Sequence, residues 1–173
     1  AFCGSSYAQK DEALLKAVEG RKAGAIADIE KLVNIDSGTG YTEGLSKIEA
    51  ILVARLKALG ADVKLTPSDA PTVGNIIVGT LQGKGSKTAM LLVHYDTVFA
   101  TGEAAKRPFR VEGNKAFGPG IADAKPGLVF ILNAVELLKE RGFDQYKTIT
   151  VVFNADEEKS SLGSRAAVKK LAA

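Results

Sequence analysis

The segment 148–153, Thr-Ile-Thr-Val-Val-Phe, places the strongest constraint on how this 173-residue chain can fold. β-Branched and aromatic residues favour strands, and an apolar run of this kind is typical of a strand that is buried on both faces. Such a strand needs a covering layer on each side, which helices supply in α/β proteins. The segment therefore predicts a central strand in a layered α/β fold.

Helical and strand-like patterns surround this segment. Apolar residues recur at three- and four-residue steps over 11–35, over about 42–59, from about Lys125 to Arg141, and from about Gly163 onward. Short strands are predicted at 62–65, 75–81 and 88–94, with a hairpin-like turn at 83–86 and a small hairpin over 109–117. Helices that alternate with apolar strands predict a mostly parallel or mixed sheet flanked by helices.

Composition excludes several classes of function. The 23 basic and 20 acidic residues leave a net charge of +3, too balanced to indicate a nucleic-acid partner. No apolar run is long enough to predict a membrane span. Cys3 is the single cysteine, so neither an intrachain disulfide nor a thiolate metal cluster is expected. These bounds fit an ordinary globular protein.

The first residues raise the question of export. Ser6-Tyr7-Ala8 places small residues where a signal peptidase reads, and a polar, helix-forming sequence follows from Gln9. We therefore interpret residues 1–8 as the tail of an export signal, which predicts a periplasmic or secreted protein. A frayed N-terminus explains the same residues equally well, because the basic and apolar regions of a signal are missing.

Three short segments carry side chains suited to metal chemistry, and the first contains the only histidine. His94 and Asp96 are two residues apart at the end of a strand, so their side chains are expected on the same side. A histidine that binds a metal usually has its second nitrogen held by a carboxylate or carbonyl, a role that Asp96 is placed to fill. A structural histidine is the alternative, which His94 alone does not exclude.

The other two segments supply carboxylates. Asp123 lies in a Gly/Pro-rich turn just before a helix, where it can bridge two cations or simply cap the helix. The run 156–158, Asp-Glu-Glu, follows the strand 148–153, and sites in open α/β sheets gather beyond the carboxyl ends of strands. Adjacent glutamates cannot point the same way, so one can bind metal while the other handles a proton. A solvated acidic turn is the alternative.

In combination and order, these segments resemble the N-terminal part of the co-catalytic zinc peptidases of the aminoacylase and glutamate carboxypeptidase family, in particular the periplasmic enzymes of the carboxypeptidase G type. The resemblance extends over about Gln9 to Leu171. It rests on the motifs Leu-Val-Asn-Ile at 32–35, Asp-Thr-Val at 96–98, Pro-Phe-Arg-Val-Glu-Gly at 108–113, Gly-Pro-Gly-Ile-Ala-Asp at 118–123 and Asp-Glu-Glu-Lys at 156–159.

The resemblance implies a role for each candidate residue. His94 would bind one zinc ion, with Asp96 orienting it, and Asp123 would bridge two zinc ions. Glu157 would be the general base, and Glu158 would bind the second zinc ion. The bond between Asp123 and Ala124 would be cis. The implied substrate is a small peptide or N-acyl amino acid, from which a C-terminal amino acid is released.

This chain also departs from the family pattern. Members are more than twice as long, and their later acidic and histidine ligands and small dimerisation domain have no counterpart here. Pro126-Gly127 replaces a Gly-Gly pair, and Ser160-Ser161 replaces a glycine. We therefore expect residues 9–173 to be a truncated, inactive N-terminal part of a catalytic domain that binds zinc loosely and self-associates as a homo-oligomer. A non-catalytic metal-binding or interaction module on the same fold is the alternative.

Overall fold

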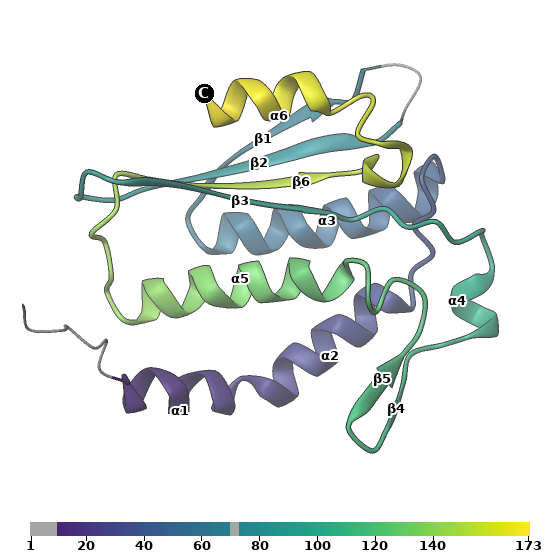
Figure 1. Ribbon diagram of the computed structural model, residues 1–173, viewed down its shortest axis with the longest axis horizontal. Coiled ribbons are helices and arrows are strands. Elements are labelled where there is room, and N and C mark those ends of the chain that lie inside the picture. Colours follow the sequence, from purple (N-terminus) through teal and green to yellow (C-terminus); the bar gives the residue numbers. More distant parts are fainter. Residues whose placement is uncertain (1–9, 70–72) are drawn as a thin grey trace, which may run out of the picture.

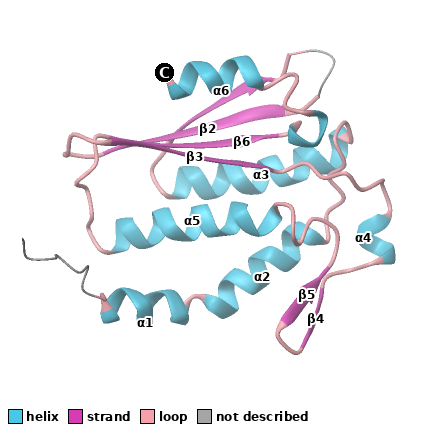
Figure 2. Cartoon of the chain, in the orientation of Figure 1, coloured by secondary structure: helices cyan, strands magenta, loops and turns pink. Residues whose placement is uncertain are grey.

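A four-stranded sheet with helices on both faces forms the body of the protein (Figures 1 and 2). The computed structural model describes residues 10–69 and 73–173, so the segment 1–8, interpreted above as an export-signal tail, lies outside the described residues. The strands are β1 (Asp62–Pro67), β2 (Asn75–Gln82), β3 (Thr88–His94) and β6 (Thr148–Asn154). The predicted α/β class, with helices flanking a sheet, is confirmed.

Strand pairing makes the sheet mixed. The strand order is β1-β2-β6-β3, in which only β3 and β6 pair in parallel, while the β1–β2 and β2–β6 pairs are antiparallel. A mostly parallel sheet is therefore wrong for the described residues, and the mixed alternative is right. β6 is the central strand, and Val151, Val152 and Phe153 are fully buried, as the apolar run predicts.

The hairpin-like turn predicted at 83–86 is wrong, because β6 lies between β2 and β3. The backbone N–H groups of Gly83 and Gly85 instead donate to the carbonyls of Lys147 (3.0 Å) and Tyr146 (2.8 Å), just before β6. Local turn composition carries no information about a strand that is inserted from far along the chain. The second predicted hairpin is confirmed as β4 (Arg110–Glu112) and β5 (Lys115–Phe117).

Helices cover the sheet in two unequal layers. α3 (Thr42–Ala58) and α5 (Lys125–Glu140) lie along one face, and α6 (Arg165–Ala172) lies on the other (Figure 1). The short helices α4 (Glu103–Lys106) and η1 (Glu157–Lys159) follow β3 and β6. The core lies between the sheet and the first layer, where the apolar stripes predicted for α3 and α5 are buried: Ile48, Leu52, Leu56, Leu128, Leu132 and Val135.

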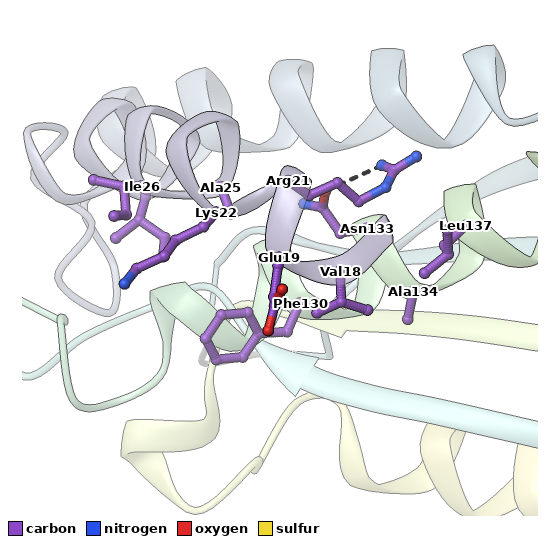
Figure 3. A pocket seen from close by; sticks show the side chains of 11 residues that line it. Val18, Glu19, Arg21, Lys22, Ala25, Ile26, Phe130, Asn133, Ala134 and Leu137 are labelled. Carbon is purple, nitrogen blue, oxygen red and sulfur yellow. Dashed lines mark hydrogen bonds between the residues drawn. The ribbon is translucent and has the colours of Figure 1, made fainter. Parts of the chain in front are cut away.

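The helix predicted over 11–35 is divided in two at Arg21. α1 (Glu12–Gly20) and α2 (Lys22–Val33) flank this residue, whose guanidinium pairs with Glu136 at 2.9 Å and with Glu140, both on α5. Leu14, Leu15 and Val18 of α1 remain exposed, so this part of the predicted stripe does not enter the core. A cleft of about 560 Å³ lies between these helices and α5, with Val18, Ile26 and Phe130 among its lining residues (Figure 3).

Among the helices in the described part of the chain, none combines the length and the apolar composition needed to cross a membrane.

Candidate metal centre

The parallel pair β3–β6 brings two of the chemistry-bearing segments together. His94 and Asn154 are register partners at the carboxyl ends of these strands. Just beyond them, the N–H of Tyr95 donates to the carbonyl of Asn154 at 2.9 Å. The residues that follow each strand therefore emerge at the same edge of the sheet, where sites of α/β proteins gather.

His94 lies at the centre of the site and is only 7% exposed. Its Nδ1 faces Asp96, at 3.1 Å from the backbone oxygen and 3.2 Å from Oδ1. Its Nε2 lies 2.9 Å from Oδ1 of Asp123 and 3.9 Å from Oε2 of Glu157. His94 and Asp96 thus lie on the same side, as predicted, and the second ring nitrogen points at the other carboxylates.

Asp96 is fully buried and connects three segments of the chain. Beyond its contact with His94, it accepts hydrogen bonds from the Thr39 hydroxyl at 2.6 Å and from the backbone N–H groups of Glu157 at 3.1 Å and Glu158 at 3.2 Å. Asp96 therefore fixes both the imidazole and the backbone of the acidic pair. Sequence reasoning missed Thr39; a hydroxyl inside the Gly-rich break at 37–40 was the available signal.

Asp123 reaches the site from the turn that precedes α5. Its side chain is 70% exposed, and the N-cap position of α5 is Ala124, without a side-chain hydrogen bond. The helix-cap interpretation of Asp123 is therefore wrong. The peptide bond between Asp123 and Ala124 is cis, as the resemblance implies.

Lys125, directly after this turn, is a buried residue that sequence reasoning missed as a positioning group. Its Nζ donates to the carbonyls of Leu32 at 2.9 Å and Ile35 at 2.6 Å, which ties the start of α5 to the end of α2. Burial lowers the pKa of Lys125 to about 8, although the nearby charge of Asp36 opposes this shift. A lysine next to an expected acidic ligand was the signal for such an anchor.

The paired glutamates adopt different positions. One ligand atom each from His94, Asp123 and Glu158 lie within 4.8 Å of one another, whereas Glu157 stands beside this trio with 52% of its side chain exposed. Burial, and next the negative charge of Asp123, raise the pKa of Glu158. Two roles for the two glutamates, as the sequence predicts, fit this placement.

The donor set of the trio suits a metal ion. One imidazole nitrogen and two carboxylate oxygens are ligand types that zinc accepts, and neighbouring carboxylates repel one another without a cation between them. Burial would lower the pKa of His94, but hydrogen bonds to Asp96 and Asp123 raise it to about 9. At neutral pH the His94 ring therefore carries an additional proton. The trio, which we call the metal group, could hold a metal ion once that proton is displaced.

Asp156, the first acid of the run 156–158, turns away from the metal group. It is fully buried and accepts the backbone N–H groups of Gly163 at 2.6 Å and Ser164 at 3.0 Å. The amide of Asn154 also faces it at 3.3 Å. The solvated acidic turn is therefore wrong for Asp156, which closes the loop after β6.

Comparison with known proteins places this geometry in a family. The family model described as Peptidase family M20/M25/M40 matches residues 90–173, which include all three segments of the site. The chain is 50% identical over 163 residues to carboxypeptidase G2 of Pseudomonas sp. (strain RS-16). This alignment covers 94% of this chain and 39% of that enzyme. The chain thus spans about two fifths of the length of this curated relative.

Solved structures share this fold. Human carnosine dipeptidase 1 aligns with a TM-score of 0.75 at 20% identity, over 92% of this chain and 37% of that one. A tripeptidase from Staphylococcus aureus aligns with a TM-score of 0.65 at 29% identity, over 82% of this chain and 38% of that one. Shared sequence, fold and site segments lead to one conclusion: the chain belongs to peptidase family M20/M25/M40.

Proposed function

We propose that this chain supplies part of the active site of a zinc-dependent carboxypeptidase, which hydrolyses a C-terminal amide bond of a small peptide or N-acyl amino acid. The convergence of His94, Asp123 and Glu158 from three separate segments within 4.8 Å carries the proposal. Identity of 50% to carboxypeptidase G2 supports the reaction class. Two zinc ions bound here would lower the pKa of a shared water molecule and polarise the scissile carbonyl.

Two further residues of the chain are placed for proton transfer and for positioning of the metal group. Glu157 stands next to the metal group but outside it, with its Oε2 3.9 Å from the His94 ring, so its carboxylate can take a proton from the attacking water. The same carboxyl group can then return the proton to the leaving amine. Asp96 is a positioning residue, since it holds Nδ1 of His94 and the backbone of both glutamates.

The metal group supplies only some of the ligands that two zinc ions need. A closed zinc site has four ligands, so three donors are too few for two ions. We propose that residues 9–173 form the N-terminal part of a catalytic domain, and that further ligands come from elsewhere in an enzyme as long as its curated relative. We also propose that the protein is exported to the periplasm or secreted, and that it self-associates.

Zinc binding by the chain itself tests the assignment. We expect Glu158→Gln to lower zinc affinity by at least tenfold, because it removes a ligand, and Glu157→Gln to leave it within about threefold. Glu112→Gln, on the exposed β4–β5 hairpin, is the matched control. Affinity is measured by competition with a chromogenic chelator. Loss of zinc in Glu157→Gln together with retention in Glu158→Gln would overturn the roles.

Turnover is tested in a form of the protein as long as carboxypeptidase G2. There, Glu157→Gln should abolish hydrolysis of an N-acyl glutamate while both zinc ions remain bound. Zinc stoichiometry and amide hydrolysis are measured on the same purified sample. Stoichiometric zinc without hydrolysis in the unsubstituted protein would favour the non-catalytic metal-binding module.

A further inference from the structure

A small cleft adjoins the metal group and shares two of its ligands. It has a volume of about 280 Å³, and Asp123 and Glu158 lie in its wall. The rest of the wall comes from the loops at 98–99 and 118–122, with Val98, Phe99 and Ile121 as its large apolar side chains. A substrate whose amide reaches the metal group would place a neighbouring substituent in this cleft.

Val98 is presented to solvent by a fixed backbone. The segment before it pairs with residues 37–39: the N–H of Thr97 donates to Ser37 at 2.9 Å, and its carbonyl accepts from Thr39 at 3.0 Å. Side chains alternate along such an extended segment, so Thr97 is 1% exposed and Val98 is 70% exposed. A β-branched side chain is also stiff at its first torsion angle. An exposed valine is thus held in place beside the metal group.

The next residue along this loop is equally constrained. The guanidinium of Arg107 lies over the Phe99 ring, 5.0 Å from its centroid. The carbonyl of Phe99 also packs against Gly38 so closely that a Cβ on that glycine would come within 2.3 Å of the oxygen. The backbone of this loop is therefore held against Gly38, and the Phe99 ring is held beneath Arg107.

The opposite wall packs directly against this loop. A Cβ on Gly120 would lie 2.9 Å from Cγ2 of Thr97, and the φ angle of Gly120 is +78°, which favours glycine. Two walls in contact at their base make a preformed cleft, and a preformed cleft binds a ligand without the cost of ordering its own loops.

The side chains that line the cleft determine which substituents of a substrate it binds favourably. Among the described residues that line it, the only ionisable side chains are those of Asp123 and Glu158, and both are acidic. An anionic substituent placed here would find no cationic side chain in this lining to pair with. An apolar substituent would cover Val98, Phe99 and Ile121, and would gain the free energy of burying that surface.

We propose that Val98, Phe99 and Ile121 form a subsite that binds an uncharged, apolar group of the substrate next to the scissile amide. The proposal rests on the function proposed above, because it takes the metal group as the point where the amide is held. It makes the chain selective for apolar over anionic substituents on this side of the amide.

Simple hydroxamates test the selectivity without turnover. The chain, loaded with stoichiometric zinc, is titrated calorimetrically with acetohydroxamic, isovalerohydroxamic and succinic monohydroxamic acids. We expect the isovaleryl compound to bind about tenfold more tightly than the acetyl compound, which corresponds to burying about two methyl groups. The succinyl compound should bind no more tightly than the acetyl compound. Equal affinities for the acetyl and isovaleryl compounds would overturn the subsite.

Substitutions locate the preference. Val98→Asp should reduce the preference for the isovaleryl compound to within about twofold, and Val98→Ala should reduce this preference to about threefold. Val111→Asp is the matched control, because Val111 is also an exposed valine, at 51%, but lies on the β4 hairpin strand. A Val98→Asp chain that keeps the full tenfold preference would place the apolar contact elsewhere.

A metal-free arm separates the subsite from the proposed function. Isovaleramide, which does not bind zinc, is titrated into the zinc-free chain while methyl resonances are followed by NMR. We expect the Val98 and Ile121 methyl signals to shift at millimolar ligand and the Val111 signals to stay. No shift at Val98 and Ile121 would refute the subsite, whatever the zinc result. Failure to bind zinc would count against the proposed function alone.

Discussion

The carboxyl ends of β3 and β6 carry the same pattern and put it to different uses. His94-Tyr95-Asp96 and Asn154-Ala155-Asp156 each place a polar side chain and an aspartate two residues apart around a buried residue. The two strands are parallel neighbours, and the first residues of the two triplets are register partners. Both aspartates are fully buried, and both accept backbone N–H groups.

Their partners make the difference. Asp96 accepts from Glu157 and Glu158 on the neighbouring segment and faces the His94 ring, so it connects the metal group to the acidic pair. Asp156 accepts from Gly163 and Ser164 of its own loop. A buried aspartate beyond a strand therefore does not by itself mark a functional site; which groups it holds in place decides its role.

The largest effect is expected at Asp156, on the side that serves the fold. Asp156→Ala removes the acceptor of the Gly163 and Ser164 N–H groups and leaves these donors unsatisfied. We expect the free energy of unfolding to fall by about 3–4 kcal/mol, since each buried unsatisfied group costs about 1–3 kcal/mol. Urea denaturation measures the change. The exposed Asp62→Ala is the control and should show no measurable change; a similar result at Asp156 would break the comparison.

The two triplets should also differ in their response to pH. The folded state of the metal-free chain raises the pKa of His94 from 6.5 to about 9, so this residue stabilises the fold below pH 6.5 and loses that contribution as the pH rises through 9. His94→Asn gives β3 the polar residue that β6 carries. The difference in free energy of unfolding between the unsubstituted protein and His94→Asn should shrink by about 3 kcal/mol from pH 6 to pH 10.

Denaturation in the presence of a chelator, at several pH values, measures this difference. A constant difference across the range would show that the contacts of His94 with Asp96 and Asp123 do not favour its protonated form.

Zinc affinity should separate the two aspartates most cleanly. Asp96→Asn removes the negative charge facing Nδ1 of His94, and loss of such an outer partner typically weakens metal binding by about 10–100-fold. Asp156→Asn is the matched change on the other triplet and should leave zinc affinity within about threefold. Competition with a chelator on the folded proteins measures both. Equal losses would mean that the loop after β6 positions the metal group as strongly as Asp96 does.

Local patterns explain why much of the fold could be predicted from the sequence. The stripe of α3 and the apolar run of β6 have strong periodicity or composition, and both elements form close to the predicted bounds. The error at 83–86 has a different origin, because pairing of β2 with β6 depends on residues far along the chain. The first helix is divided at Arg21, whose guanidinium pairs with Glu136 of α5, a contact that the local pattern does not contain.

The candidate site shows the same division between local and distant information. His94, Asp96, Asp123, Glu157 and Glu158 were predicted from their residue types and order, and the structure brings them together; their roles stay predictions. The supporting residues were missed because their importance comes from tertiary contacts: Thr39 and Lys125 bond to segments more than fifty residues away. A hydroxyl in a Gly-rich break and a lysine beside an acidic ligand mark candidates, but the sequence does not show which distant group each one contacts.

The middle residues of the triplets offer the smallest effect. The hydroxyl of Tyr95 donates to the carbonyl of Asn75 at 2.7 Å and accepts from its N–H at 3.3 Å, and burial raises the pKa of Tyr95, so it stays protonated. Ala155 has no hydroxyl group and lies against Gly74, where a Cβ added to Gly74 would approach the Cβ of Ala155 within 2.6 Å.

Tyr95→Phe should therefore lower the free energy of unfolding by about 1 kcal/mol, the usual net value of one hydrogen bond. Zinc affinity should not change, because the hydroxyl bonds to β2 and not to the metal group. A loss of zinc affinity of tenfold or more in Tyr95→Phe would show that β2 helps to position His94, and the two triplets would then differ at all three residues.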